Sequence, residues 1–240
     1  MTTDSTSTEL PQQQAYSESP TTGGLADVQL AENPEPRCAC LLLLDTSYSM
    51  NGEPIRQLNS GLIGFKDELI ADELAAKRVE VAVITFGPPQ LLCDFTEATV
   101  FQPPTLTASG DTPMGAAITM GLDRLQERKK TYDAAGISRF RPWVFLITDG
   151  APTDSWAGAA QLVHDGEARG AFSFYAVGVQ GADFAKLNAI APPNRPAAKL
   201  DGLRFRDLFS WLSKSMHAVS RSTPGTDVNL STPGWISAPG

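Results

Sequence analysis

Short runs of apolar residues recur along the chain, and each has the length of one buried strand. Four consecutive leucines in Leu41–Asp45 are typical of a strand buried on both faces of a parallel sheet. The run Leu91–Phe95 follows Gly87-Pro88-Pro89, so we expect it to return as a hairpin, antiparallel to the strand before it. The predicted strands are Leu41–Asp45, Val79–Phe86, Leu91–Phe95, Trp143–Thr148, Phe172–Val179 and Ala198–Leu200.

Between these runs, apolar residues recur at spacings of three and four, which is the pattern of a helix that buries one stripe. The clearest case begins at Glu53-Pro54, where proline suits the first turn of a helix. It continues through Ile55, Leu58, Leu62, Phe65 and Leu69. The other predicted helices are Met114–Lys130, Trp156–Arg169, Asp183–Ile190 and a closing helix marked by Phe205, Leu208, Phe209, Leu212 and Met216.

This alternation of strands and helices predicts an α/β fold: a doubly wound, mostly parallel sheet with one antiparallel edge strand and helices on both faces. We place this domain at residues 37–220. Residues 1–36 are rich in Ser, Thr and Pro and poor in large apolar residues, so we expect them to be disordered. Residues 221–240 repeat Gly, Pro and Ser, and we expect a flexible tail in which Trp235 is either a docking residue or an inert end.

Composition restricts the kinds of partner and the cellular compartment that we expect for the protein. The chain has 240 residues, of which 42% are hydrophobic, enough for one sizeable core. Its formal net charge of -8 makes nucleic acid or an anionic membrane an unsuitable partner. The N-terminus does not resemble a secretory signal, and the three scattered cysteines (Cys38, Cys40 and Cys93) favour a reducing compartment. We therefore expect a cytoplasmic protein.

Oxygen-bearing side chains follow the ends of two predicted strands and precede one helix. Asp45, Ser47 and Ser49 come directly after the leucine run, Thr112 precedes Pro113, and Asp149 ends the Trp143–Thr148 strand. The carboxyl ends of strands in a doubly wound sheet face a common rim, so these loops are expected to converge there. Helix capping is the competing interpretation, since Asp, Ser and Thr are also common N-caps.

Two carboxylates and three hydroxyls suit Mg²⁺, with Mn²⁺ and Ca²⁺ as alternatives. If neutral hydroxyls contact the ion directly, it keeps much of its positive charge and attracts an anionic ligand from another molecule. The residues therefore predict a site that captures a carboxylate of a protein partner.

The pattern resembles the metal-ion-dependent adhesion site of von Willebrand factor A domains, which is Asp-x-Ser-x-Ser followed by a distant Thr and a distant Asp. Asp45, Ser47, Ser49, Thr112 and Asp149 match those positions in order. The resemblance implies a Rossmann-like fold and a non-enzymatic, magnesium-dependent protein-binding module. Tyr48 departs from the pattern, because the family often has glycine there.

Within that family, the chain looks similar to the tellurium-resistance TerY type. The stretches that carry this likeness are 101–112, 147–154 and 209–215. The likeness implies a bacterial stress or defence system whose gene clusters include kinases, phosphatases or other Ter proteins.

Two other functions stay open. A magnesium site on such a sheet also resembles that of haloacid-dehalogenase phosphatases, but those need a second aspartate where this chain has Ser47. The Ser- and Thr-rich segment before residue 37 is also compatible with a scaffold regulated by phosphorylation.

Overall fold

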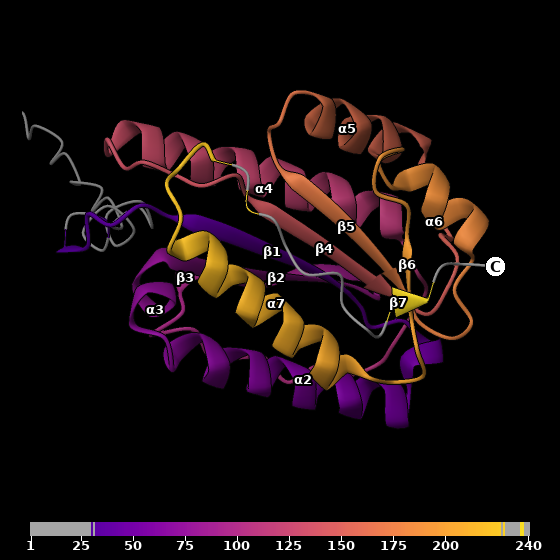
Figure 1. The fold of residues 1–240 in the computed structure, drawn as a ribbon. Coiled ribbons are helices and arrows are strands. Elements are labelled where there is room, and N and C mark those ends of the chain that lie inside the picture. The colour runs from indigo at the N-terminus through magenta and orange to yellow at the C-terminus, as the bar shows by residue number, and fades with distance from the viewer. Residues whose placement is uncertain (1–29, 31, 227, 229–235, 238–240) are drawn as a thin grey trace, which may run out of the picture.

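A seven-stranded sheet forms the centre of the part of the chain described by the computed structural model, which covers residues 30, 32–226, 228 and 236–237. The strand order is β3-β2-β1-β4-β5-β6-β7 (Figure 1). The strands are β1 (Cys38–Asp45), β2 (Val79–Phe86), β3 (Pro89–Glu97), β4 (Trp143–Thr148), β5 (Ser173–Gly178), β6 (Ala198–Leu200) and β7 (Ile236–Ser237).

Strand β1 is an interior strand of this sheet and runs parallel to both of its neighbours, β2 and β4. All eight of its residues are buried, as the leucine run predicts. Leu42 and Leu44 belong to the core on one face, whereas Leu41 and Leu43 belong to the core on the other. This alternation explains why the strand needs apolar residues at every position.

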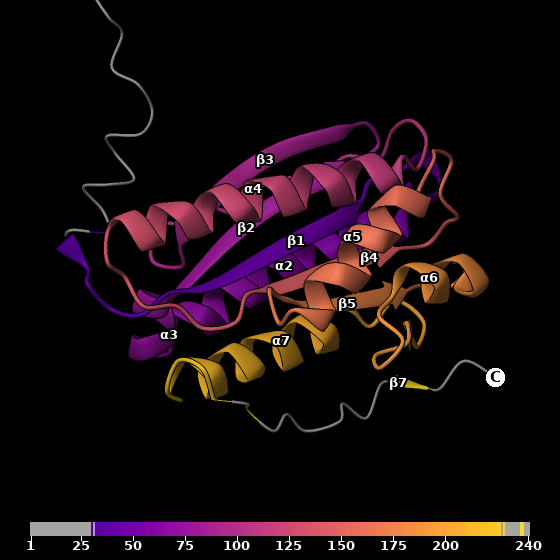
Figure 2. The same cartoon turned by 90° about the horizontal axis from the view of Figure 1, so that it is seen from above.

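Helices cover both faces of the sheet (Figure 2). The core on one face is built with α2, α3 and α7, and the core on the other with α4, α5 and α6. The predicted doubly wound architecture is therefore confirmed. The helices are α2 (Glu53–Ile70), α3 (Glu73–Arg78), α4 (Met114–Ala134), α5 (Ala157–Ala168), α6 (Phe184–Ile190) and α7 (Phe205–Ser220), with a 3-10 turn η1 (Tyr48–Met50).

One edge of the sheet agrees with the prediction, whereas the other edge and one short helix were not predicted. Strands β2 and β3 pair antiparallel, as expected for the hairpin. A second antiparallel pair joins β6 to β7, which lies within the segment predicted to be a flexible tail. Helix α3 was not predicted; Asp72 begins it by accepting hydrogen bonds from the amides of Leu74 and Ala75.

The other predictions for the ends of the chain concern residues outside the described part. Residues 1–29, in which disorder and phosphorylation are predicted, and Trp235 lie outside the described residues. In the described part, no helix combines the length and the apolar character needed to cross a membrane.

Candidate metal centre

The loop that follows β1 holds Asp45 in a fixed orientation. Its carboxylate is fully buried and accepts one hydrogen bond from the backbone amide of Ser47, at 2.8 Å from Oδ1. The hydroxyl of Thr148, the last residue of β4, donates to Oδ2. Both oxygens are therefore anchored at the rim where parallel strands β1 and β4 end side by side.

A continuous set of hydrogen bonds joins this loop to the end of β4. Ser47 begins the turn η1, which places the hydroxyl of Ser49 3.0 Å from that of Ser47. The Ser49 hydroxyl also donates to Oδ1 of Asp149 at 2.7 Å. Ser49 and Asp149 are 100 positions apart in the sequence. Four of the five predicted residues are thus brought together.

Thr112 reaches the same place from the loop before α4. A Cβ atom added to Gly150 would lie 3.4 Å from the Thr112 hydroxyl oxygen and 3.9 Å from Oδ2 of Asp45. The hydroxyl therefore stands beside the two carboxylate loops. Two hydrogen bonds with Thr153 hold the backbone of Thr112 in this position. The Thr112 amide donates to the Thr153 hydroxyl, and the Thr153 amide donates to the Thr112 carbonyl.

Asp154 secures these two loops to each other. Its carboxylate accepts hydrogen bonds from the amides of Gly115 and Ala116, the first turn of α4, at 3.0 and 2.8 Å. Gly115 permits the close approach, since a Cβ there would lie 2.5 Å from the carbonyl oxygen of Ser155. Asp154 thus caps α4 rather than the helix that follows it in sequence.

The electrostatics of the site leave negative charge without a partner. Burial raises the pKa of Asp45, and repulsion from Asp149 raises it further, against the lowering effect of hydrogen bonds from Ser47 and Thr148. Burial likewise raises the pKa of Asp149. Among the ion pairs of the described residues, none involves either carboxylate.

This donor set fits a hard divalent cation. Two carboxylates that repel each other, with three hydroxyls beside them, offer oxygen ligands and an uncompensated charge. Within the described residues, no cluster of three or more His, Cys, Asp or Glu side chains is arranged to hold a metal, so any cation here would depend on the hydroxyls.

Two polar residues of the site were missed at the sequence level. Thr148 bonds Asp45 and also accepts the Gly150 amide at 3.1 Å, while Thr153 holds Thr112. The sequence offers one signal for Thr148: it is the single hydroxyl in the otherwise apolar run Trp143–Thr148. No comparable signal marks Thr153, because its partner belongs to another loop.

Known protein structures share this fold. A von Willebrand factor type A protein from Catenulispora acidiphila has a TM-score of 0.52 and 16% identity, covering 76% of this chain and 43% of that one. The pilus adhesin SpaC from Lactobacillus rhamnosus has a TM-score of 0.60 and 15% identity, covering 76% and 30%.

Proximal thread matrix protein 1 from the mussel byssus has a TM-score of 0.52 and 17% identity, covering 78% of this chain and 48% of that one. The chain thus spans less than half the length of each of these three. A search of curated protein sequences returned no match.

The family model of the von Willebrand factor type A domain matches residues 41–206. This range begins within β1 and contains β4 and all the loops of the candidate metal centre. Since it spans well over half of the sequence, and since solved members share the sheet and its helices, the chain belongs to the von Willebrand factor type A domain family.

Proposed function

We propose that this chain is a non-enzymatic, magnesium-dependent module that binds an acidic residue of a protein partner. Asp45, Ser47, Ser49, Thr112 and Asp149 are the proposed metal ligands. The observation that carries the proposal is the meeting of the buried carboxylate of Asp45 and the half-buried carboxylate of Asp149, neither in an ion pair, with three hydroxyls at one rim of the sheet. Domains of this family typically mediate protein interactions, which supports a binding role.

When bound, the cation supplies a positive charge that takes a Glu or Asp oxygen as a further ligand. The chain's own residues determine access to it. Ser49 and Tyr48 are exposed at the tip of η1, and Tyr48 keeps 72% of its surface accessible. A phenol ring there would contact whatever approaches the rim, so Tyr48 is placed to influence which acidic partners fit.

For the cellular setting, we propose a bacterial cytosolic protein of the TerY type, acting in a tellurite, stress or defence system. The support is the likeness of residues 101–112, 147–154 and 209–215 to that type, together with three free cysteines. The proposed partners are proteins from the same gene clusters, including kinases, phosphatases and Ter proteins.

The metal role can be tested by calorimetric titration with Mg²⁺ after treatment with EDTA. We expect Asp45→Asn and Ser49→Ala each to weaken Mg²⁺ binding by more than about tenfold, since each removes an oxygen ligand or its charge. Tyr48→Ala is the matched control and should bind Mg²⁺ like the wild type, because its side chain points into solvent.

Thermal unfolding separates loss of a ligand from loss of the fold. Mg²⁺ should raise the melting temperature of the wild type by binding the native state only. Asp45→Asn should lose this effect but be no less stable in EDTA, since it removes a buried charge that Asp149 repels. Equal Mg²⁺ affinity in Asp45→Asn and wild type would end the proposal.

A phosphatase assay tests the proposal that the module is non-enzymatic. Mg²⁺-dependent hydrolysis of a generic aryl phosphate, abolished by Asp45→Asn, would instead support a phosphatase. We expect no such turnover, because Ser47 stands where the phosphatases that the site resembles carry a second aspartate.

A further inference from the structure

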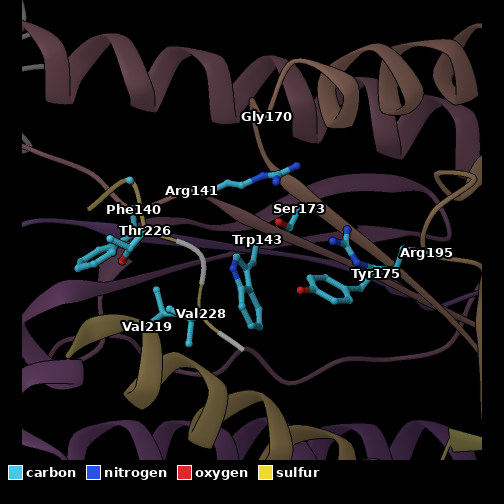
Figure 3. A pocket seen from close by; sticks show the side chains of 11 residues that line it. Phe140, Arg141, Trp143, Gly170, Ser173, Tyr175, Arg195, Val219, Thr226 and Val228 are labelled. Carbon is cyan, nitrogen blue, oxygen red and sulfur yellow. The ribbon is translucent and has the colours of Figure 1, made fainter. Parts of the chain in front are cut away.

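A cavity lies at the opposite end of the sheet from the candidate metal centre. Its volume is about 310 Å³, and it is lined by Trp143 and Ser173, the first residues of β4 and β5 (Figure 3). Tyr175, Arg141 and Arg195 also line it, and Val219 at the end of α7 closes one side. This volume is at the lower end of the range for sites that bind small molecules.

Three polar groups in this cavity, on the buried Trp143 and Ser173 and the half-buried Tyr175, have no hydrogen-bond partner within the described chain. Trp143 is 5% exposed and Ser173 is 6% exposed. Neither the Trp143 indole N–H, the Ser173 hydroxyl nor the Tyr175 hydroxyl hydrogen-bonds to any other described residue. Buried donors are almost always satisfied by protein or by ordered water, so these groups around one cavity are available to a ligand that accepts hydrogen bonds.

Two guanidinium groups border the same cavity and share one carboxylate. Arg141 and Arg195 both pair with Glu167, which is 4% exposed. Glu167 accepts a hydrogen bond from the amide of Phe174, and Arg195 donates one to the Phe174 carbonyl, at a buried position of β5 that does not pair with β6. Nη1 of Arg141 and both Nε and Nη2 of Arg195 make no hydrogen bond to a described residue.

The surroundings of this cavity are cationic although the chain as a whole is acidic. An adjoining hollow shares Phe140, Arg141 and Gly170 with the cavity and adds Lys129 and Arg139. Burial, and then the positive charge of Arg139, lower the pKa of Lys129. The local field therefore favours an anion.

We propose that this cavity binds the phosphate group of a small phosphorylated molecule. A carboxylate has two accepting oxygens with roughly four acceptor positions, and the free N–H and O–H groups around the cavity outnumber these positions. A phosphate monoester has three strongly accepting oxygens and carries more negative charge, so it suits the cavity better. Arginine suits bidentate contact with such oxygens. The side chains of Trp143 and Val219, which also line the cavity, offer apolar surface for the organic part.

Calorimetric titration of the full chain with phenyl phosphate, in EDTA so that the metal centre is empty, tests the proposal. Benzoate is the comparison ligand. We expect phenyl phosphate to bind with millimolar or tighter affinity and benzoate at least about fivefold more weakly. The Trp143 indole cross-peak in the ¹H–¹⁵N spectrum, assigned with Trp143→Phe, should shift on addition of phenyl phosphate.

Substitutions locate the binding. Ser173→Ala and Tyr175→Phe remove only a hydroxyl and should each weaken phenyl phosphate binding by about tenfold, the usual loss for a hydrogen bond to a charged group. Arg195→Gln should weaken it further, but it also leaves Glu167 with one fewer partner, so the hydroxyl variants are the decisive ones. Arg56→Gln, on the distant helix α2, is the matched control.

The experiments on the cavity and those on the metal centre can fail independently of each other. Unchanged binding in Asp45→Asn would show that the cavity acts independently of the metal centre, as proposed. No binding of phenyl phosphate at millimolar concentration, equal binding of benzoate, or unchanged affinity in both Ser173→Ala and Tyr175→Phe would overturn the inference without affecting the magnesium proposal.

Discussion

At the scale of single residues, the rim of the sheet depends on polar side chains whose partners come from other loops. Thr148 anchors Asp45 across β1 and β4, and Asp154 anchors the start of α4 from the loop after β4. Asp154 replaces an N-cap that α4 lacks, since Pro113 precedes the helix and makes no side-chain cap. The loop before α4 is held in the same way, since the amide of Thr112 donates to the hydroxyl of Thr153, 41 positions later.

We expect Asp154→Ala to lower the free energy of unfolding by about 1–2 kcal/mol, the usual cost of losing a helix cap. Urea denaturation would measure it. Asp111→Ala is the matched control, because Asp111 is an exposed aspartate on the neighbouring loop; it should change stability by no more than about 0.5 kcal/mol. Equal stability of the two variants would contradict the capping role.

At the scale of elements, the contact between α2 and α7 fixes how the two longest helices on one face are placed. Gly61 of α2 lies directly under the ring of Phe209, and a Cβ there would stand 2.6 Å from that ring and 3.3 Å from the Cβ of Phe205. Phe209 is 1% exposed and packs against Phe65 with the two rings tilted by 43°, so it has little room to move. Glycine at this position is thus a requirement of helix packing.

The helix α2 provides its own control, because Gly64 has no atom within 4 Å of an added Cβ. Gly61→Ala should destabilise the protein by about 1–3 kcal/mol through overpacking. Gly64→Ala should stabilise it by about 0.5–1 kcal/mol, since alanine is the better helix former. Thermal or urea unfolding of both variants would check this, and the same sign for both would argue against the packing explanation.

At the scale of the whole molecule, a buried ionic network fastens the start of the domain to the sheet and to α4. Glu80 of β2 is 2% exposed and accepts hydrogen bonds from Arg37, Arg128 and Tyr132. Arg37 in turn donates to the carbonyl oxygen of Asn33, before the predicted domain boundary. The chain is therefore already held to the fold several residues ahead of β1.

We expect Glu80→Gln to lower the free energy of unfolding by about 3–5 kcal/mol, because it leaves buried guanidinium groups without their carboxylate. The carboxylate of Glu127 pairs with Arg124, and the Glu127 side chain is 61% exposed. Glu127→Gln should therefore change the free energy of unfolding by less than about 1 kcal/mol. Chemical denaturation of the two variants compares a buried ion pair with an exposed one. Similar losses would show that burial is not what gives the Glu80 network its effect.

The hydrophobic pattern was enough to predict the doubly wound sheet and its long helices. Buried strands need apolar residues on both faces, as in Leu41–Leu44, and amphipathic helices need a stripe, as in Ile55–Leu69. Helix α3 and strand β7 escaped, because their six and two residues are too few to show a period. Their existence depends on an N-cap and on backbone pairing with β6.

The candidate ligands Asp45, Ser47, Ser49, Thr112 and Asp149 could be named from the sequence, because parallel strands must end at a shared rim. Only the tertiary structure decided what surrounds them: the bond from Thr148 to Asp45, and the use of Asp154 to cap a helix other than its own. The cavity between Trp143, Ser173 and Arg195 was equally invisible, since its residues carry no common motif. Periodicity is a local property of the chain, whereas contacts between distant loops exist only after folding brings them together.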